Sequence, residues 1–153
     1  MCDKKTDKGI SSRLRSEPMS TGAFEAATAS VILRCRDLGT TVPWYRECLG
    51  WAPVSSGSEG GDHHVTFSVG GLLISLWELP VGVEPAQAGI RGAYVAMYVH
   101  ENLERLRDRL TERGVAARAI IDAGDFRSFR FSDPDGNVFE VTSSVASTPA
   151  PTS

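Results

Sequence analysis

The sequence has no long apolar run, few cysteines and no excess of basic charge. Its longest apolar stretch, residues 71–79, is interrupted by Glu78 and is far shorter than the ~20 residues of a transmembrane helix. The cysteines Cys2, Cys35 and Cys48 are odd in number and lack CxxC spacing, which argues against a disulfide framework and a zinc knuckle. The formal net charge is -3, with both signs mixed along the chain. We therefore expect a cytoplasmic protein that binds neither nucleic acid nor membranes.

Several motifs of catalytic and nucleotide-binding proteins are also missing. The chain contains no GxGxxG, no GxxxxGK[ST], no HExxH and no GxSxG. These motifs mark Rossmann, P-loop, zincin and α/β-hydrolase sites, respectively. The sequence thus gives no sign of those four chemistries.

Both ends of the chain are polar and show no hydrophobic period. Residues 1–24 carry five Lys/Arg against three Asp/Glu, and residues 146–153 are mostly Ser, Thr, Pro and Ala. Segments of this composition bury too little apolar area to become ordered, so we expect a disordered arm and a disordered tail. The remaining residues, 25–145, suffice for a single domain. The sequence leaves both Met1 and Met19 open as the physiological start.

Within this domain, the same order of elements occurs twice. In the first half, apolar periodicity and turn residues predict a strand at 30–38, a helix at 40–49, and strands at 51–56, 63–69 and 72–78. In the second half they predict a strand at 94–99, a helix at 101–114, and strands at 115–121, 126–132 and 137–143. Each half therefore reads as a βαβββ module.

The two halves also keep a constant spacing. Ser30 and Tyr94, which begin the first strands, lie 64 positions apart, and so do Gly50 and Gly114, which end the helices. Such a repeat indicates a duplicated module. We predict an α+β fold with modules at residues 28–79 and 92–144, joined by a linker at 80–91.

Two motifs add a family resemblance to this plan. The first module contains VPWYRECLGW, and the second closes on FSDPDGNVFEV at residues 131–141. Together with the duplication, over about residues 28–144, they resemble the vicinal oxygen chelate superfamily, which includes glyoxalase I, extradiol dioxygenases and bleomycin resistance proteins. The resemblance implies a cup-shaped sheet with the helices on its outer face.

The resemblance also implies where a metal ion would bind in the metal-using members. The four ligand positions of those members fall on Ser30, Ser75, Tyr94 and Glu140 of this sequence. Only Glu140 is a good ligand, because divalent ions at such sites prefer carboxylate oxygens and imidazole nitrogens. We therefore expect a metal-free cavity without a cofactor, as in the bleomycin resistance proteins. A metal held by Glu140 and His64 is a weaker alternative.

Strand alternation extends these positions to a candidate ligand site. Side chains two residues apart share a face of a sheet, so aromatic and polar groups gather on the cavity side. The expected site residues are Arg34, His64, Ser75, Trp77, Tyr94, Tyr98, Arg130 and Glu140. Apolar walls with a few polar groups suit a drug-sized ligand. Glu140 is the candidate catalytic residue, and an ion pair with Arg34 or Arg130 is an equally good interpretation of it.

These observations favour a glyoxalase/bleomycin resistance-like protein that binds a small aromatic or cationic molecule. We expect it to act as a homodimer, because members of the superfamily commonly build cavities across a dimer. The alternatives are a metal-dependent lyase, epimerase or dioxygenase of the same superfamily, and a metal-free enzyme in which Glu140 moves a proton. The sequence leaves open whether the protein is an enzyme.

Overall fold

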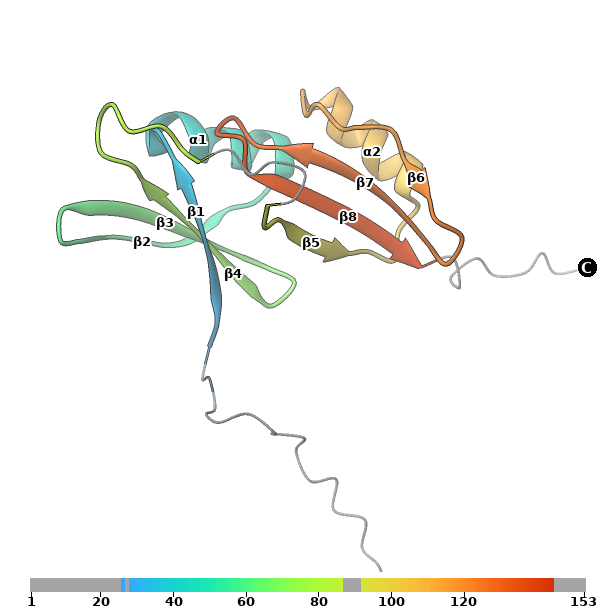
Figure 1. Cartoon of the computed structure of the whole chain (residues 1–153), viewed down its shortest axis with the longest axis horizontal. Coiled ribbons are helices and arrows are strands. Elements are labelled where there is room, and N and C mark those ends of the chain that lie inside the picture. The colour runs from blue at the N-terminus through green and yellow to red at the C-terminus, as the bar shows by residue number, and fades with distance from the viewer. Residues whose placement is uncertain (1–25, 27, 87–91, 145–153) are drawn as a thin grey trace, which may run out of the picture.

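The computed structural model describes residues 26, 28–86 and 92–144, and shows two βαβββ units in succession (Figure 1). The first consists of β1 (Ser30–Cys35), α1 (Leu38–Trp44), a π-helical turn η1 (Tyr45–Leu49), β2 (Pro53–Glu59), β3 (Asp62–Val69) and β4 (Leu72–Glu78). The second consists of β5 (Val95–Tyr98), α2 (Leu103–Glu112), β6 (Ile121–Asp122), β7 (Phe126–Ser132) and β8 (Val138–Ser144). The predicted arm and tail, 1–24 and 146–153, lie outside the described residues.

Each unit forms its own four-stranded mixed sheet. The strand orders are β1-β4-β3-β2 in the first sheet and β5-β8-β7-β6 in the second. In both sheets the first strand pairs with the fourth in parallel, and the other pairs are antiparallel. This correspondence confirms the duplicated βαβββ module and the α+β fold class. The first strands, β1 and β5, are edge strands, and no ladder joins the two sheets within the described chain.

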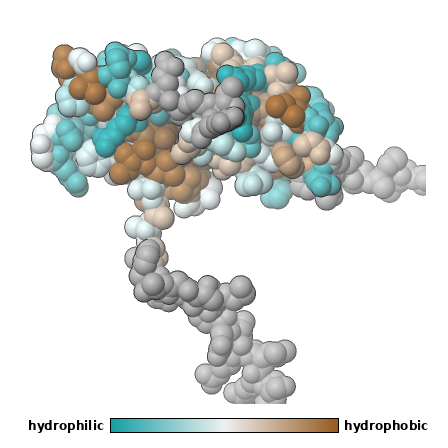
Figure 2. Space-filling model, in the orientation of Figure 1, coloured by the Kyte–Doolittle hydropathy of each residue, from teal (hydrophilic) through white to brown (hydrophobic). Residues whose placement is uncertain are grey.

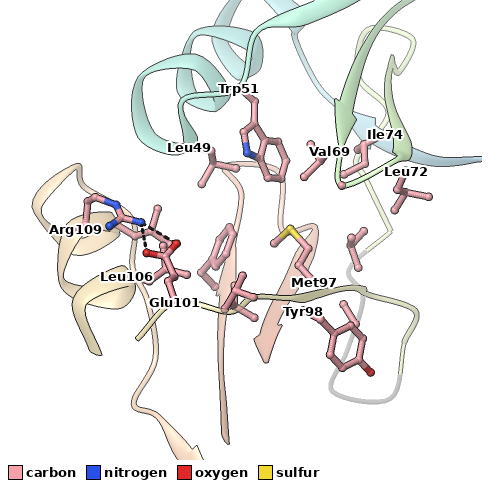
Figure 3. A pocket seen from close by; sticks show the side chains of 17 residues that line it. Leu49, Trp51, Val69, Leu72, Ile74, Met97, Tyr98, Glu101, Leu106 and Arg109 are labelled. Atoms are coloured by element: carbon pink, nitrogen blue, oxygen red, sulfur yellow. Dashed lines mark hydrogen bonds and ion pairs between the residues drawn. The ribbon is translucent and has the colours of Figure 1, made fainter. Parts of the chain in front are cut away.

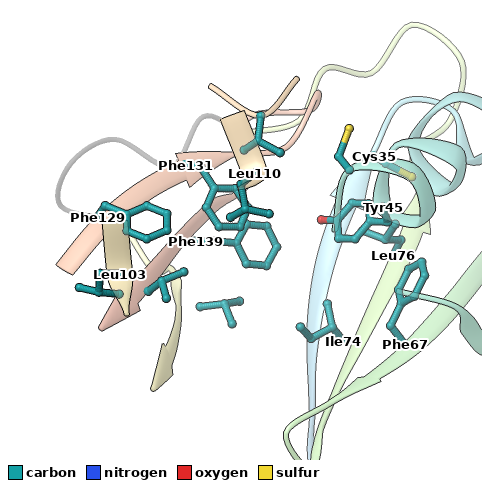
Figure 4. Packing of buried hydrophobic residues seen from close by; sticks show 14 residues of the cluster. Cys35, Tyr45, Phe67, Ile74, Leu76, Leu103, Leu110, Phe129, Phe131 and Phe139 are labelled. Carbon is teal, nitrogen blue, oxygen red and sulfur yellow. The ribbon is translucent and has the colours of Figure 1, made fainter. Parts of the chain in front are cut away.

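The helices cover one face of each sheet and enclose a core that both units share. Helix α1 packs on β3 and β4, and α2 packs on β7 and β8. The ring of Tyr45 stacks on Phe67 of the first sheet at 5.2 Å and meets Phe139 of the second sheet edge-on at 6.1 Å (Figure 4). These side chains are fully buried, so the two units bury their helix sides against each other.

Among the described residues, neither helix is long and apolar enough to cross a membrane.

The turn between β7 and β8 is hydrogen-bonded to the helix of the other unit. The Tyr45 hydroxyl donates to Asp133 Oδ2 at 2.7 Å, and the Thr41 hydroxyl donates to Asp135 Oδ2 at 2.6 Å. The backbone N–H of Arg36 donates to Asp135 Oδ1 at 2.9 Å. Both carboxylates are buried. The sequence predicts only a local turn here, but the structure shows a contact between modules, which we call the clasp (Thr41, Tyr45, Asp133 and Asp135).

Several elements differ from their predicted extents. Strand β1 ends at Cys35 rather than at residue 38, and β2 covers Pro53–Glu59 rather than 51–56. Helix α1 begins earlier than the predicted residue 40, because the Asp37 side chain caps it by accepting from the N–H of Gly39 at 2.9 Å. The predicted strand at 115–121 is wrong except at its end, since β6 covers only Ile121–Asp122. The carbonyl of Arg118 accepts from Arg107 Nε of helix α2 at 2.8 Å, so that side chain binds the segment.

Candidate functional site

The predicted site residues lie on the sheet faces that turn away from the shared core. Because the helix sides of the two units meet, the other faces point outward and carry exposed side chains. Tyr98 is 81% exposed and Tyr94 is 43% exposed. We call these surfaces the first face (Arg34, His64, Ser75 and Trp77) and the second face (Tyr94, Tyr98, Arg130 and Glu140).

On the first face, three side chains form a row across β1, β4 and β3. Arg34 pairs in register with Trp77, and Trp77 pairs with His64. The guanidinium carbon of Arg34 lies 5.9 Å from the centroid of the Trp77 ring, and the His64 ring stacks on Trp77 at 4.7 Å with an interplanar angle of 17°. The indole of Trp77 therefore makes a cation–π contact with Arg34 and a ring stack with His64.

The position of His64 depends on a glycine in the neighbouring strand. Gly57 of β2 pairs with His64, and a Cβ at Gly57 would lie 2.8 Å from His64 Cε1. Any other residue at position 57 would push against the imidazole. The Nδ1 atom of His64 is buried and has no hydrogen-bond partner among the described residues. Gly57 thus leaves room for the ring that stacks on Trp77.

Ser75, the remaining predicted residue of the first face, is bonded within the sheet. Its hydroxyl lies 2.8 Å from that of Thr66, its register partner on β3. Both residues are buried. Ser75 therefore contributes to the floor of the first face.

On the second face, Arg130 connects an acid and an aromatic ring. Arg130 Nε donates to Glu140 Oε2 at 2.7 Å, and its guanidinium carbon lies 4.4 Å from the centroid of Tyr94. The hydrogen bond to Glu140 raises the pKa of Arg130 above its usual value. Of the two ion-pair partners that the sequence left open for Glu140, Arg34 and Arg130, the structure shows Arg130. Tyr98, at the end of β5, is the most exposed residue of this face.

The residues at the four metal positions do not fit a divalent ion. Ser75 is hydrogen-bonded to Thr66, and Glu140 forms an ion pair with Arg130. Ser30 and Tyr94 contribute hydroxyl groups, which lack the charge and basicity that divalent ions require at such sites. Within the described ranges, no three His, Cys, Asp or Glu side chains come close enough together to hold a metal ion. His64 and Glu140, the weaker alternative, lie on different sheets.

One pocket of the described chain, of about 570 Å³, borders His64 of the first face and no residue of the second face. An apolar pocket of about 510 Å³ lies on the helix side, between the two units (Figure 3). Of the predicted site residues it includes only Tyr98. Trp51 and Met97 line the pocket and were not predicted to do so, because apolar residues on a helix-covered face have the same sequence pattern whether they fill a core or border a cavity.

One relative combines sequence similarity with a named activity. Biphenyl-2,3-diol 1,2-dioxygenase 2 of Rhodococcus globerulus is 29% identical over 124 residues, which cover 79% of this chain and 64% of the relative. This chain therefore spans less than two thirds of that protein's length.

Solved structures and a family model agree on the fold. A glyoxylase/bleomycin resistance protein/dioxygenase domain from Frankia sp. EAN1pec is 25% identical, with a TM-score of 0.65 and coverage of 79% of this chain and 99% of that one. The fosfomycin resistance protein FosX of Listeria monocytogenes is 19% identical, with a TM-score of 0.64 and coverage of 80% and 96%. The model described as the Glyoxalase/Bleomycin resistance protein/Dioxygenase superfamily matches residues 27–141. The chain therefore belongs to this superfamily.

Proposed function

We propose that the protein binds a small planar aromatic molecule on its open sheet faces without using a metal ion. The observation that carries this proposal is the row of Arg34, Trp77 and His64, which presents a guanidinium and two stacked rings. Arg34 is exposed, so a planar ligand can displace it and stack on the Trp77 ring. Such a ring stack contributes about 0.5–1.5 kcal/mol of binding free energy in addition to that of burying the apolar area. The Rhodococcus relative, whose name gives an aromatic diol as its substrate, supports the same ligand class.

The charges on the two faces favour a neutral or anionic ligand. Glu140 is the acid that would attract a cation, but its carboxylate is bonded to Arg130. The faces then present the guanidinium groups of Arg34 and Arg130 against this one carboxylate. Of the aromatic and cationic ligands that the sequence allowed, we therefore retain the aromatic one.

We further propose that a second copy of the chain completes the site. The two faces point away from the core that their own units share. A ligand on one face of a single copy would therefore be covered on one side only. The edge strands β1 and β5 have unpaired backbone groups, and Ile32 on β1 is 52% exposed. Apolar side chains gather where β1 and β4 lie (Figure 2). A homodimer that joins the first face of one copy to the second face of the other would cover these edges.

Ligand binding is tested by calorimetric titration of catechol, 1-naphthol and 1-naphthoate in buffer with a chelator. We expect saturable binding of the two naphthyl compounds, and a loss of about tenfold in affinity, which is ~1.4 kcal/mol, in Trp77→Ala. The control is Val81→Ala, which removes an exposed apolar side chain that lies outside both faces. Equal affinity in the two variants would show that Trp77 is not part of the site.

The dimer is tested by mixing two variants that each bind the ligand weakly. Trp77→Ala damages the first face and Arg130→Ala the second, so a mixed dimer of these chains contains one intact site if the faces belong to different copies. We expect each variant alone to bind more weakly, by about tenfold for Trp77→Ala, and the refolded mixture to regain the original affinity at one site per dimer. A mixture that still binds weakly, although sedimentation shows mixed dimers, would place both faces of a site within one copy.

A second candidate function follows from the Rhodococcus relative. A ring-cleaving dioxygenase would need a metal ion, which the donors at the four family positions do not fit. Elemental analysis of the purified protein and oxygen uptake with 2,3-dihydroxybiphenyl test this function. Stoichiometric iron that survives dialysis and is lost in Glu140→Gln would replace the metal-free proposal.

A further inference from the structure

The apolar pocket between the units occupies the place that corresponds, in the duplicated plan, to the clasp. Asp133 lies 64 positions after Val69, and Arg109 lies 64 positions after Tyr45. The turn of the second hairpin is one residue longer, since Val69 pairs with Leu72, whereas Asp133 bonds to Asn137. Val69, Leu72 and Arg109 all line the pocket. The same junction between hairpin and helix is thus closed by hydrogen bonds at one end of the molecule and open at the other.

The pocket end lacks the hydrogen bonds of the clasp because different residue types stand at the corresponding positions. Where the clasp has a carboxylate and a phenol, the pocket has Val69 and Arg109, which do not bond to each other. Arg109 instead donates to both carboxylate oxygens of Glu101, at 2.9 and 3.0 Å. The hairpin and α2 are left with apolar side chains facing a space of about 510 Å³.

The pocket walls define the class of molecule that would fit. The lining includes the buried residues Ile74, Val95, Phe131 and Val141. Leu49, Trp51, Met97 and Leu106 also line it (Figure 3). The charged groups of the lining, Glu101 and Arg109, already neutralise each other. A charged ligand would therefore lose its hydration without gaining a partner. The volume is within the range of about 300–1,000 Å³ that is typical of small-molecule sites.

We propose that this pocket is a second binding site, for an uncharged apolar molecule about the size of two or three rings. It shares only Tyr98 with the proposed site on the outer faces, because alternation places Leu72 and Leu73 on opposite sides of β4. The flat surface of a second copy would fill the pocket less well, because it would not reach the buried residues of the lining. Trp51 and Met97 at its sides add a polarizable surface that adapts to a ligand's shape.

The test uses N-phenyl-1-naphthylamine, an uncharged dye that fluoresces in apolar surroundings, with the full-length protein. The measurements are made in the Trp77→Ala background, because the outer site proposed above would also accept an uncharged naphthyl compound, and we expect saturable binding at one site per chain. Leu72→Trp, which fills the pocket, should weaken binding about tenfold, whereas Leu73→Trp, the same change on the opposite face of β4, should leave it within about twofold. The unchanged protein should bind the dye in the pocket with the same affinity, and any additional dye site that it shows should be absent in Trp77→Ala, which separates this site from the one proposed above. Circular dichroism of each variant verifies that it is folded.

Three results would overturn the proposal. The first is dye binding that Leu72→Trp and Leu73→Trp weaken equally, or that does not saturate. The second is equal affinity for the anionic analogue 8-anilinonaphthalene-1-sulfonate, which would contradict the preference for an uncharged ligand. The third is dye binding that weakens as protein concentration rises and dimers form, which would assign the pocket to a second copy of the chain.

Discussion

Replacing Tyr45 by Phe removes one hydroxyl from the clasp and nothing else. The Tyr45 ring is fully buried and stacks on Phe67, a contact that phenylalanine keeps, so no cavity forms. The lost bond joins the hydroxyl to the buried carboxylate of Asp133 at 2.7 Å. Hydrogen bonds to charged groups contribute about 1.5–3 kcal/mol. We expect the free energy of unfolding to fall by roughly 2 kcal/mol and the melting temperature to fall by roughly 8 °C.

Urea denaturation at neutral pH, followed by circular dichroism, measures this loss. The matched control is Tyr98→Phe, which removes a hydroxyl from a residue that is 81% exposed and should cost less than about 0.5 kcal/mol. The m-value should stay constant, since both variants keep the fold. Equal losses in the two variants would refute the idea that the buried hydroxyl holds the modules together.

Three further results are expected. Burial raises the pKa of Asp133, so the folded state binds the proton of this carboxyl group more tightly than the unfolded state does. The free energy of unfolding therefore falls as pH rises from about 3.8 through the raised pKa, and Asp133→Asn should reduce this pH dependence in urea denaturation. Burial, reinforced by Asp135, raises the pKa of Cys35 to about 12, so mass spectrometry should find this thiol unmodified by iodoacetamide at pH 8 until the protein unfolds. Gly57→Ala should displace His64 from its indole and shift tryptophan emission, whereas Ser56→Ala should not.

The repeated module could be predicted because each of its parts has a local cause. Strands β4 and β7 lie at their predicted residues, since apolar alternation and the flanking turns both specify them. Gly50 ends the first helix in the left-handed conformation, as its position after an apolar helix predicts. The same alternation separated the buried face of each sheet from the face that carries Trp77 and Glu140.

Contacts between the modules could not be predicted, because they join residues that are far apart in the chain. The Asp133 turn looks complete as a local motif, and nothing in it indicates that Tyr45 will donate to its carboxylate. Likewise, alternation placed Arg34 and Arg130 on the same kind of face without showing that their sheets turn apart. The apolar pocket was missed for a third reason: periodicity identifies apolar faces but does not measure the space between them.

The clasp also makes the two halves of the chain unequal. All of its hydroxyls, from Thr41 and Tyr45, belong to the first module, and its carboxylates, from Asp133 and Asp135, belong to the second. A fragment holding one module would lose the hydrogen bonds from Tyr45 to Asp133 and from Thr41 to Asp135, and would expose to water the apolar side chains that the two modules bury together. After duplication, each half has come to depend on the other, so neither would be expected to survive as an independent folding unit.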